Sequence, residues 1–337
     1  MYLPSGYLDF NFINRQNATF NILIGGRGIG KTYGCLSYVS GTMRPFLLLR
    51  RTQSQTDIIG NVDFHPLKKI YADAGATFTI EKIRKTNATK CIDEEDSIIC
   101  YNMALSTFAN VRGYSTEDIT CIVYDEFIPS PTERPIKDEG HAFLHCYETI
   151  NRNREISGKP PVKVFLLANA FDFTSSILRV LNLSDTIEKM IRKKKEYLIV
   201  NRGDQKILLC LPHSPISEKK EKTALYQIAD AGFKKLAIEN RPDMDMSQIK
   251  YRPLAEYRLQ ITTPEFGIYR HKTRAELYVT PNSENQRARD HYDNTPRGRL
   301  YFYNNHRGLI SAYLQQKIFF QNALCEKLFV NWLTRKE

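Results

Sequence analysis

The stretch that most constrains this chain is the glycine-rich segment from Gly25 to Thr32, which reads GGRGIGKT. It fits the phosphate-binding pattern G-x-x-x-x-G-K-[ST] at every required position, between an apolar run and a helix-compatible stretch. Glycines permit backbone conformations closed to other residues, so amide groups can point inward at an anion. The helix that follows adds the positive end of its dipole. The segment therefore predicts a strand, loop and helix that bind a nucleoside triphosphate.

Each position of this loop has an expected role. Lys31 is expected to reach the β- and γ-phosphates, and the Thr32 hydroxyl to bind Mg²⁺. Arg27 has two interpretations, a contact with the γ-phosphate or a neighbouring subunit, and a solvent-facing cation. The expected nucleotide cradle consists of Gly25, Gly26, Arg27, Gly28, Ile29, Gly30, Lys31 and Thr32.

A second motif supplies carboxylates about 95 residues downstream. The run TCIVYDEF, 120–127, is an apolar strand that ends in two adjacent acids. Asp125 is expected to hold Mg²⁺, and Glu126 to be the general base that activates the attacking water. The sequence contains no N-K-x-D or T-K-x-D motif, which a GTPase uses to recognise guanine. A small-molecule kinase is also disfavoured, because its nucleophile is the substrate and it needs no glutamate to activate water. The pair favours ATP hydrolysis coupled to mechanical work.

Three more polar side chains are candidates. Asn169 follows the apolar run VFLLA, at a strand end where α/β proteins bind ligands, and is expected to sense the γ-phosphate. A simple turn asparagine is the alternative. Arg152 and Arg154 in NRNRE are candidates for an arginine finger supplied to a neighbour, or surface charges.

The pattern of apolar runs predicts a mostly parallel α/β sheet with helices on both faces in the first part of the chain. Near-continuous apolar runs suit strands buried on both faces. We expect strands at 20–24, 46–49, 98–101, 120–124 and 162–168, helices at 31–40 and 142–153, and an antiparallel meander over 76–102.

The C-terminal part has a different pattern. We expect an ATPase domain over 1–197, a linker region over 198–230 and a smaller α+β domain over 231–337. Within these, we expect a short strand at 206–211, a helix over 223–240, strands at 257–261, 267–280 and 298–303, and a long helix over 308–332.

Charge is distributed unevenly. Residues 1–188 hold 20 Lys and Arg against 21 Asp and Glu, residues 189–230 hold 10 against 5, and residues 231–337 hold 18 against 11. Such asymmetry favours a polyanionic partner met by the C-terminal half. There is no visible signal peptide or bilayer-length apolar run, and the seven scattered cysteines are never spaced CxxC. These features predict reduced thiols and no membrane contact.

Some patterns resemble sites and are interpreted otherwise. His141 and His145 lack the other ligands of a zinc protease, so a packed or surface pair is expected. The cationic runs at 192–195 and 218–222 are expected to be solvated, with phosphate contact as the alternative.

Taken together, ILIGGRGIGKT, FLLLRR at 46–51, FANVRGYSTEDITCIVYDEF at 108–127 and NRNREISGKPPVKVFLLANA at 151–170 resemble the genome-packaging ATPases of small, phi-29-like tailed phages. That family is distantly related to large terminases and to FtsK/HerA translocases. The resemblance implies a motor in the host cytoplasm, transiently attached to the viral prohead. It further implies a ring, most simply a pentamer, at the portal, which moves double-stranded DNA with ATP and Mg²⁺ and in some cases uses a structural RNA.

The resemblance also assigns residues. The first arginine of the matching RNR segment is the family's trans finger, here Arg152, with Arg154 as the other candidate. Arg50 and Arg51 match a pair near the nucleotide and the subunit interface. The C-terminal domain is expected to resemble an RNase H-like nuclease without catalysis, because its expected core strands, 257–261 and 300–304, carry no carboxylates and Glu276 stands alone.

Two other functions stay open. The chain could be a cellular FtsK/HerA-type translocase or helicase, although no helicase motif series beyond the two nucleotide motifs is evident. It could instead be a nucleotide-gated DNA-binding scaffold that does not cycle.

Overall fold

The computed structural model describes residues 1–111, 117–130, 132–170, 172–229, 246–281 and 288–334, together with residue 234. The chain divides into two compact units. Unit 1 contains residues 1–183 and 189–243, and unit 2 contains residues 184–188 and 244–337. Among the described residues, no helix is both long and apolar enough to cross a bilayer.

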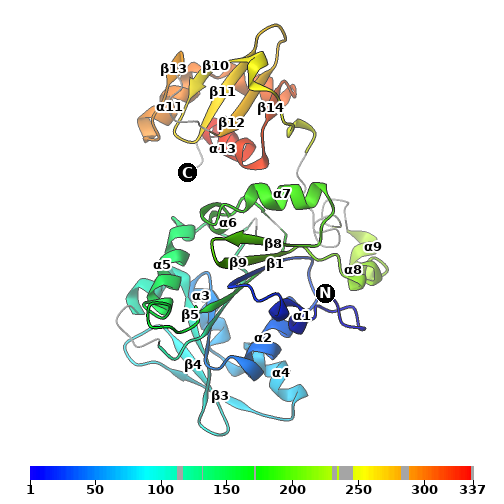
Figure 1. Ribbon diagram of the computed structural model, residues 1–337, viewed down its shortest axis with the longest axis vertical. Coiled ribbons are helices and arrows are strands. Elements are labelled where there is room, and N and C mark those ends of the chain that lie inside the picture. The colour runs from blue at the N-terminus through cyan, green and yellow to red at the C-terminus, as the bar shows by residue number, and fades with distance from the viewer. Residues whose placement is uncertain are drawn as a thin grey trace. The chain divides into compact units, whose positions relative to one another are not determined.

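Unit 1 is built on a nine-stranded sheet of order β3-β4-β5-β2-β6-β7-β1-β9-β8 (Figure 1). The five strands β5-β2-β6-β7-β1, with β9 beside β1, pair in parallel. The strands are β1 (Phe20–Ile24), β2 (Phe46–Arg50), β3 (Phe78–Lys82), β4 (Thr89–Asp93), β5 (Ile98–Ala104), β6 (Cys121–Asp125), β7 (Lys163–Ala168), β8 (Tyr197–Arg202) and β9 (Gln205–Cys210). The expected parallel-rich α/β sheet is confirmed, and β3, β4 and β5 form the expected antiparallel meander at one edge.

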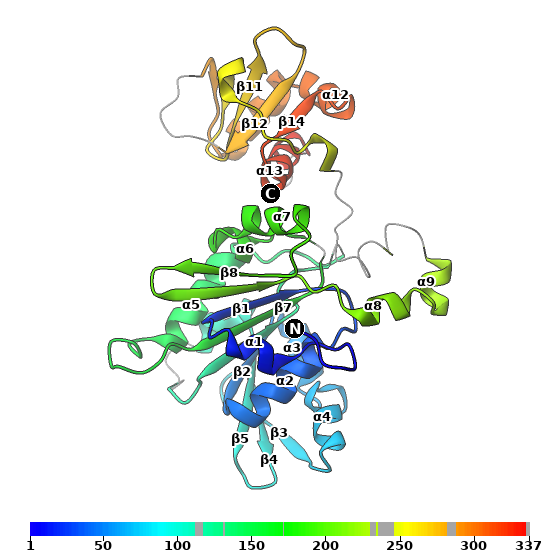
Figure 2. The ribbon, with the colours of Figure 1, turned by 45° about the vertical axis from the view of Figure 1, so that its right-hand side comes forward.

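Helices cover both faces of this sheet, because alternate residues of its apolar strands face opposite ways. On one face, Leu48, Val123 and Phe165 belong to a core shared with α1, α2 and α4, which lie side by side (Figure 2). On the other face, the Tyr124 ring stacks on Phe143 of α5. The helices of residues 1–229 are α1 (Phe10–Arg15), α2 (Lys31–Thr42), α3 (Gln53–Ile59), α4 (Leu67–Asp73), α5 (Glu139–Asn151), α6 (Ser176–Val180), α7 (Ser184–Arg192), α8 (Pro215–Lys220) and α9 (Ala224–Ile228), with 3₁₀ turns η1 (Val62–Phe64) and η2 (Leu105–Val111). The first five residues of α7 belong to unit 2.

The linker expected over 198–230 is wrong for its first part. Strands β8 and β9 form an antiparallel hairpin, and β9 joins the sheet in parallel beside β1. Residues Ile207–Cys210 are buried there, so this short apolar run is a strand of unit 1, and unit 1 extends past the expected boundary at residue 197. Of the helix expected over 223–240, α9 ends at Ile228, and most of the rest lies outside the described residues.

Unit 2 has its own five-stranded sheet, of order β13-β10-β11-β12-β14. The meander β10-β11-β12 is antiparallel, whereas β13 and β14 pair in parallel with β10 and β12. The elements are η3 (Met246–Gln248), η4 (Leu254–Glu256), β10 (Tyr257–Thr262), β11 (Phe266–His271), β12 (Leu277–Pro281), β13 (Asp290–His291), α11 (Pro296–Asn305), α12 (Gly308–Leu314), β14 (Ile318–Phe320) and α13 (Ala323–Thr334). Its core packs Phe266, Phe302 and Trp332 edge to face.

Two expectations for unit 2 are wrong. The strand expected at 298–303 is helix α11, which starts with Pro296 and is capped by Thr295, whose Oγ1 accepts the Gly298 amide. These start signals outweigh the strand preference of LYFY. The long helix expected over 308–332 is interrupted by β14, and Asn322 then caps α13 by accepting the Cys325 amide.

Candidate nucleotide-binding site

The glycine-rich loop joins β1 to α2, as the sequence predicts. Gly28 and Gly30 have φ of +68° and +87°, in the left-handed region that glycine adopts without strain. Gly30 is also crowded, since a Cβ there would lie 3.1 Å from the Tyr7 ring. Lys31 is the first residue of α2, so the loop delivers its backbone to the positive end of that helix.

Lys31 is buried and fully engaged by oxygen atoms. Its Nζ donates to the carbonyls of Gly25 and Gly26, at 2.8 and 2.6 Å, and to Oδ1 of Asn169 at 3.1 Å. Burial lowers the pKa of Lys31 to about 7, while the Asp125 carboxylate opposes that shift. The ammonium is therefore held by neutral oxygens at the position where phosphate oxygens would neutralise it.

Thr32 and Asp125 meet next to the loop. The Thr32 hydroxyl donates to Oδ1 of Asp125 over 3.0 Å, across 93 residues of sequence. Asp125 is the last residue of β6, and it pairs in register with Leu167 of the neighbouring strand β7. A hydroxyl and a buried carboxylate side by side are the oxygen donors that Mg²⁺ accepts in phosphate-binding loops.

Glu126 and Asp125 share one cation, Arg50 at the end of β2. Its Nη1 lies 3.0 Å from Oε2 of Glu126, and its Nη2 lies 3.0 Å from Oδ2 of Asp125. Glu126 has φ of +60°, so the backbone turns sharply there and directs this residue away from the strand. The sequence places Arg50 near the nucleotide only by resemblance, and the structure adds its contact with both acids.

Arg51 has a different environment from its neighbour. Its side chain is completely buried, donates from Nε to Glu139 at 2.8 Å and lies 3.6 Å from Glu133. Glu139 also accepts the Tyr124 hydroxyl. Arg51 thus holds α5 against the sheet from within the subunit.

Asn169 lies beside the loop, one residue beyond β7. Strand β7 runs between β6 and β1, and Ala168 pairs in register with Ile24, the last residue before the loop. The Asn169 side chain accepts from Lys31. The structure therefore brings five expected site residues together at the carboxyl ends of the neighbouring strands β6, β7 and β1. They are Lys31, Thr32, Asp125, Glu126 and Asn169.

Arg152 and Arg154 do not belong to this group. Both follow α5 and precede β7, so they lie toward the amino-terminal ends of strands whose carboxyl ends carry the loop. Arg152 is exposed and its Nε donates to the Thr149 carbonyl, whereas Arg154 donates to the carbonyls of Pro160 and Glu117.

Lys220 is a neighbour of the loop whose contact the local sequence does not indicate. It is the last residue of α8, and its Nζ donates to the Arg27 carbonyl. The run 218–222 was expected to be mostly solvated, with phosphate contact only as an alternative. Because α8 reaches the loop from 193 residues away in sequence, only the three-dimensional structure reveals the contact.

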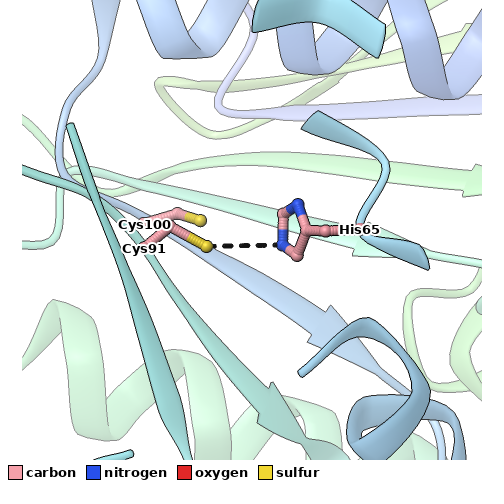
Figure 3. Close-up of side chains that lie close together, drawn as sticks. All are labelled: His65, Cys91 and Cys100. Atoms are coloured by element: carbon pink, nitrogen blue, oxygen red, sulfur yellow. Dashed lines mark hydrogen bonds between the residues drawn. The ribbon is translucent and has the colours of Figure 1, made fainter. Parts of the chain in front are cut away.

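His65, which follows η1, forms a buried cluster with Cys91 of β4 and Cys100 of β5 (Figure 3). The His65 Nε2 lies 3.5 Å from the Cys91 sulfur and 3.1 Å from Oδ1 of Asn102. However, the Leu67 amide donates to Nδ1, so a neutral ring carries its proton on Nε2, the nitrogen that faces the sulfur. A metal-bound histidine instead keeps its proton on the other nitrogen as a donor. The cluster is therefore a hydrogen-bonded core network.

The histidine pair resembling a zinc motif is also structural. His141 lies 2.6 Å from Asp138, and His145 lies 3.7 Å from Glu148. Both imidazoles are exposed and lie near acids of their own helix region, so of the packed or surface pair expected from sequence, the structure shows the surface pair.

Comparison with known proteins places this site in a family. The family model described as podovirus DNA encapsidation protein (Gp16) matches residues 4–249, which include the loop, both acids, Asn169 and Lys220. A comparison with curated protein sequences found no match.

Two solved structures resemble the whole chain. One, titled the bacteriophage Phi-29 viral genome packaging motor assembly, is 17% identical with a TM-score of 0.67 and covers 98% of this chain and 99% of its own. The other, titled the Phi-28 gp11 DNA packaging motor, is 17% identical with a TM-score of 0.61 and covers 98% of both chains. At this identity the likeness establishes a shared fold.

Proposed function

The chain belongs to the podovirus DNA encapsidation protein (Gp16) family, and we propose that it hydrolyses ATP to move double-stranded DNA into a preformed prohead. The observation that carries the proposal is the convergence of Lys31, Thr32, Asp125, Glu126 and Asn169 on one phosphate loop. The chain belongs to a DNA-encapsidation family and carries a complete set of residues for ATP hydrolysis. Together these features support a motor that uses ATP to move DNA.

The residues present fit ATP and Mg²⁺. Buried Lys31, held by two loop carbonyls, has the donors that a triphosphate requires. Mg²⁺ would be held by Thr32 and Asp125, and it would supply positive charge against the phosphates. Glu126 would take the proton of the attacking water, because its carboxylate adjoins the Asp125 site and is half exposed. Asn169, already bonded to Lys31, would report on the γ-phosphate through that shared contact.

We propose that hydrolysis takes place in a ring, most simply a pentamer, with Arg152 donated to a neighbour's nucleotide. Arg152 is exposed and follows the far end of α5, toward the amino-terminal ends of the strands whose carboxyl ends carry the loop, which suits a role in another subunit. Isolated subunits would then hydrolyse ATP slowly, because a finger contributes about 10³–10⁵ in rate in other nucleotide hydrolases. The proposed setting is the host cytoplasm, at the portal of the prohead, with or without a structural RNA between them.

Unit 2 is proposed to bind nucleic acid or the portal without cutting DNA. Arg258 and Arg270 are direct cross-strand partners, both exposed, next to Lys272 and Arg274. Glu256 and Glu276 neutralise Arg274 at 3.1 and 3.3 Å. No described carboxylate pairs with Arg258 or Arg270, and like charges opposite each other favour an anionic partner. Glu276 is held by Tyr257 and Arg274, which suits a structural role for this acid.

The test of the function is DNA-stimulated phosphate release by the full chain. Wild type is expected to release phosphate continuously and faster with double-stranded DNA, whereas Glu126→Gln, which removes the base, slows release at least about 10²-fold while still binding ATP. Unchanged release from Glu126→Gln overturns the mechanism. Absence of steady release from wild type favours the non-cycling scaffold, and release that requires strand separation favours a helicase.

A further inference from the structure

The phosphate loop is contacted by two lysines, which bind consecutive backbone carbonyls. Lys31 binds those of Gly25 and Gly26, and Lys220 binds the next one, Arg27. In the proposed function Lys31 leaves its carbonyls for phosphate oxygens, which are stronger acceptors for an ammonium group. The same exchange is open to Lys220, one residue further along the loop.

We propose that Lys220 is a second phosphate-binding lysine that acts on ATP in the same subunit. The proposal rests on the proposed function, because it assigns a ligand of the same nucleotide site. It places a fixed cation beside the triphosphate, in addition to the trans arginine, and it adds α8 to the elements that recognise the nucleotide.

The space at Gly28 supports this assignment. A Cβ at Gly28 would lie 2.3 Å from the Lys220 Nζ and 3.2 Å from its Cε. Gly28 also has positive φ, a conformation that glycine adopts without strain, and the lysine end occupies the space beside it. The loop therefore leaves room for this lysine at its rim.

The charge around Lys220 also points to an anionic ligand. Its Nζ donates to a neutral carbonyl, and among the described residues no carboxylate forms an ion pair with it. It is close enough to Lys31 that the two ammonium groups repel, which helps to lower the pKa of Lys31. Burial also lowers the pKa of Lys220 itself. Bound phosphate would stabilise both ammonium groups together, because it places negative charge between two mutually repelling cations.

Helix α8 is anchored so that Lys220 stays at the loop. Ser214 caps the helix by accepting the Ile216 amide, and its buried hydroxyl donates to the Gly6 carbonyl at 2.7 Å. Gly6 has φ of +90° and lies against Ile216. The N-terminal segment that contains Gly6 also places Tyr7 against Gly30. One contact network therefore positions both the loop and the lysine that touches it.

The experiment compares ATP and ADP binding by calorimetry for the full-length wild type and three variants. Lys220→Met removes the charge and keeps much of the side-chain volume, Lys220→Arg keeps the charge, and Lys219→Ala is the matched control on the same helix. Melting curves without nucleotide show whether each variant is folded.

Lys220→Met is expected to lower ATP affinity at least about tenfold, the value of one charge-assisted hydrogen bond, and ADP affinity less, because ADP carries less charge. Lys220→Arg is expected to recover most of the loss, and Lys219→Ala to match wild type. Wild-type ATP affinity in Lys220→Met, or equal losses for ATP and ADP, would overturn the Lys220 assignment alone. A wild type that binds neither nucleotide would overturn the proposed function and this assignment with it.

Discussion

The guanidinium of Arg50 lies 3.0 Å from the carboxylate of Glu126, joining the end of β2 to the turn after β6. The second branch of the same guanidinium lies 3.0 Å from Asp125. One arginine therefore balances both the acid expected to hold the metal and the acid expected to activate water. Because Mg²⁺ brings its own positive charge to Asp125, this pairing should matter most before nucleotide binds.

Replacing Arg50 with alanine is expected to destabilise the nucleotide-free protein by about 3 kcal/mol, because it leaves a buried carboxylate without its partner. Mg-ATP should recover part of this loss, since the metal takes over some of the lost charge. Thermal unfolding with and without a slowly hydrolysed Mg-ATP analogue measures both effects.

Lys68→Ala is the control for that experiment. Lys68 pairs with Asp63 on the surface, where both side chains are more than half exposed and solvent screens their attraction, so its loss should change stability little with or without nucleotide. If Arg50→Ala behaved like this control, or lost the same stability in both conditions, the pairing would have no bearing on the nucleotide site.

The lowered pKa of Lys31 predicts a pH dependence of ATP binding. An unfolded lysine titrates near 10.4, while burial lowers the pKa of Lys31 in the folded protein to about 7. Between these values the unfolded chain binds more protons, so the contribution of Lys31 to stability rises with pH over that window. Phosphate favours protonated Lys31, so ATP binding at pH 8 should take up a proton and weaken as pH rises.

Calorimetry of ATP binding at pH 8, in two buffers with different heats of ionisation, measures this uptake directly. Up to one proton per ATP is expected for wild type. Lys31→Arg stays charged at this pH and should show none. Proton release by wild type, or equal uptake by Lys31→Arg, would show that Lys31 is not the titrating group.

Arg152→Ala and Glu126→Gln should complement each other if the finger acts between subunits. Each variant alone is expected to lose DNA-stimulated hydrolysis, by about 10³-fold for the finger. In mixed rings, an Arg152→Ala subunit with an intact Glu126 can sit beside a Glu126→Gln subunit that supplies Arg152. Phosphate release should therefore rise when the two variants are mixed.

Arg154→Ala is the comparison for this assignment. Its side chain holds the turn between α5 and β7 through Pro160 and Glu117, so its replacement should affect stability more than complementation. Full activity of Arg152→Ala, or complementation only by Arg154→Ala, would move the finger away from Arg152.

Replacing Arg258 and Arg270 with alanine should weaken DNA binding by the full chain uniformly across DNA sequences. Each lost phosphate contact is expected to reduce the slope of log K against log salt by about 1. Arg274→Ala is the control, because Glu256 and Glu276 already neutralise this arginine. A salt slope unchanged in the double variant would place the DNA contact elsewhere.

Much of unit 1 follows from local sequence signals. The glycine-rich loop that begins at Gly25 follows one buried strand, and the acids after Tyr124 stand at the end of another. Because ligands of α/β proteins bind at the carboxyl ends of such strands, the proximity of the loop to the acids can be predicted from sequence. Arg50 is expected near the nucleotide only by resemblance, and its two carboxylate contacts require coordinates.

Other features depend on contacts that local patterns do not contain. Leu300 and its aromatic neighbours favour a strand by propensity, yet the cap at Thr295 and packing of Phe302 in the core produce a helix. The strand expected at 206–211 is confirmed as β9, but its place beside β1 depends on long-range pairing that the short run after a cationic segment does not indicate. Lys220 was missed because a solvated lysine and one that reaches a distant loop have the same local sequence.

The proposed packaging activity is tested most directly by DNA packaging into purified proheads, measured as DNA protected from added nuclease. Wild type with ATP is expected to protect full-length DNA, and Glu126→Gln with ATP to protect none, although it still binds nucleotide. Protection by Glu126→Gln equal to that of wild type, or no protection by wild type with ATP, would contradict the proposal that this chain is an ATP-driven DNA-packaging motor.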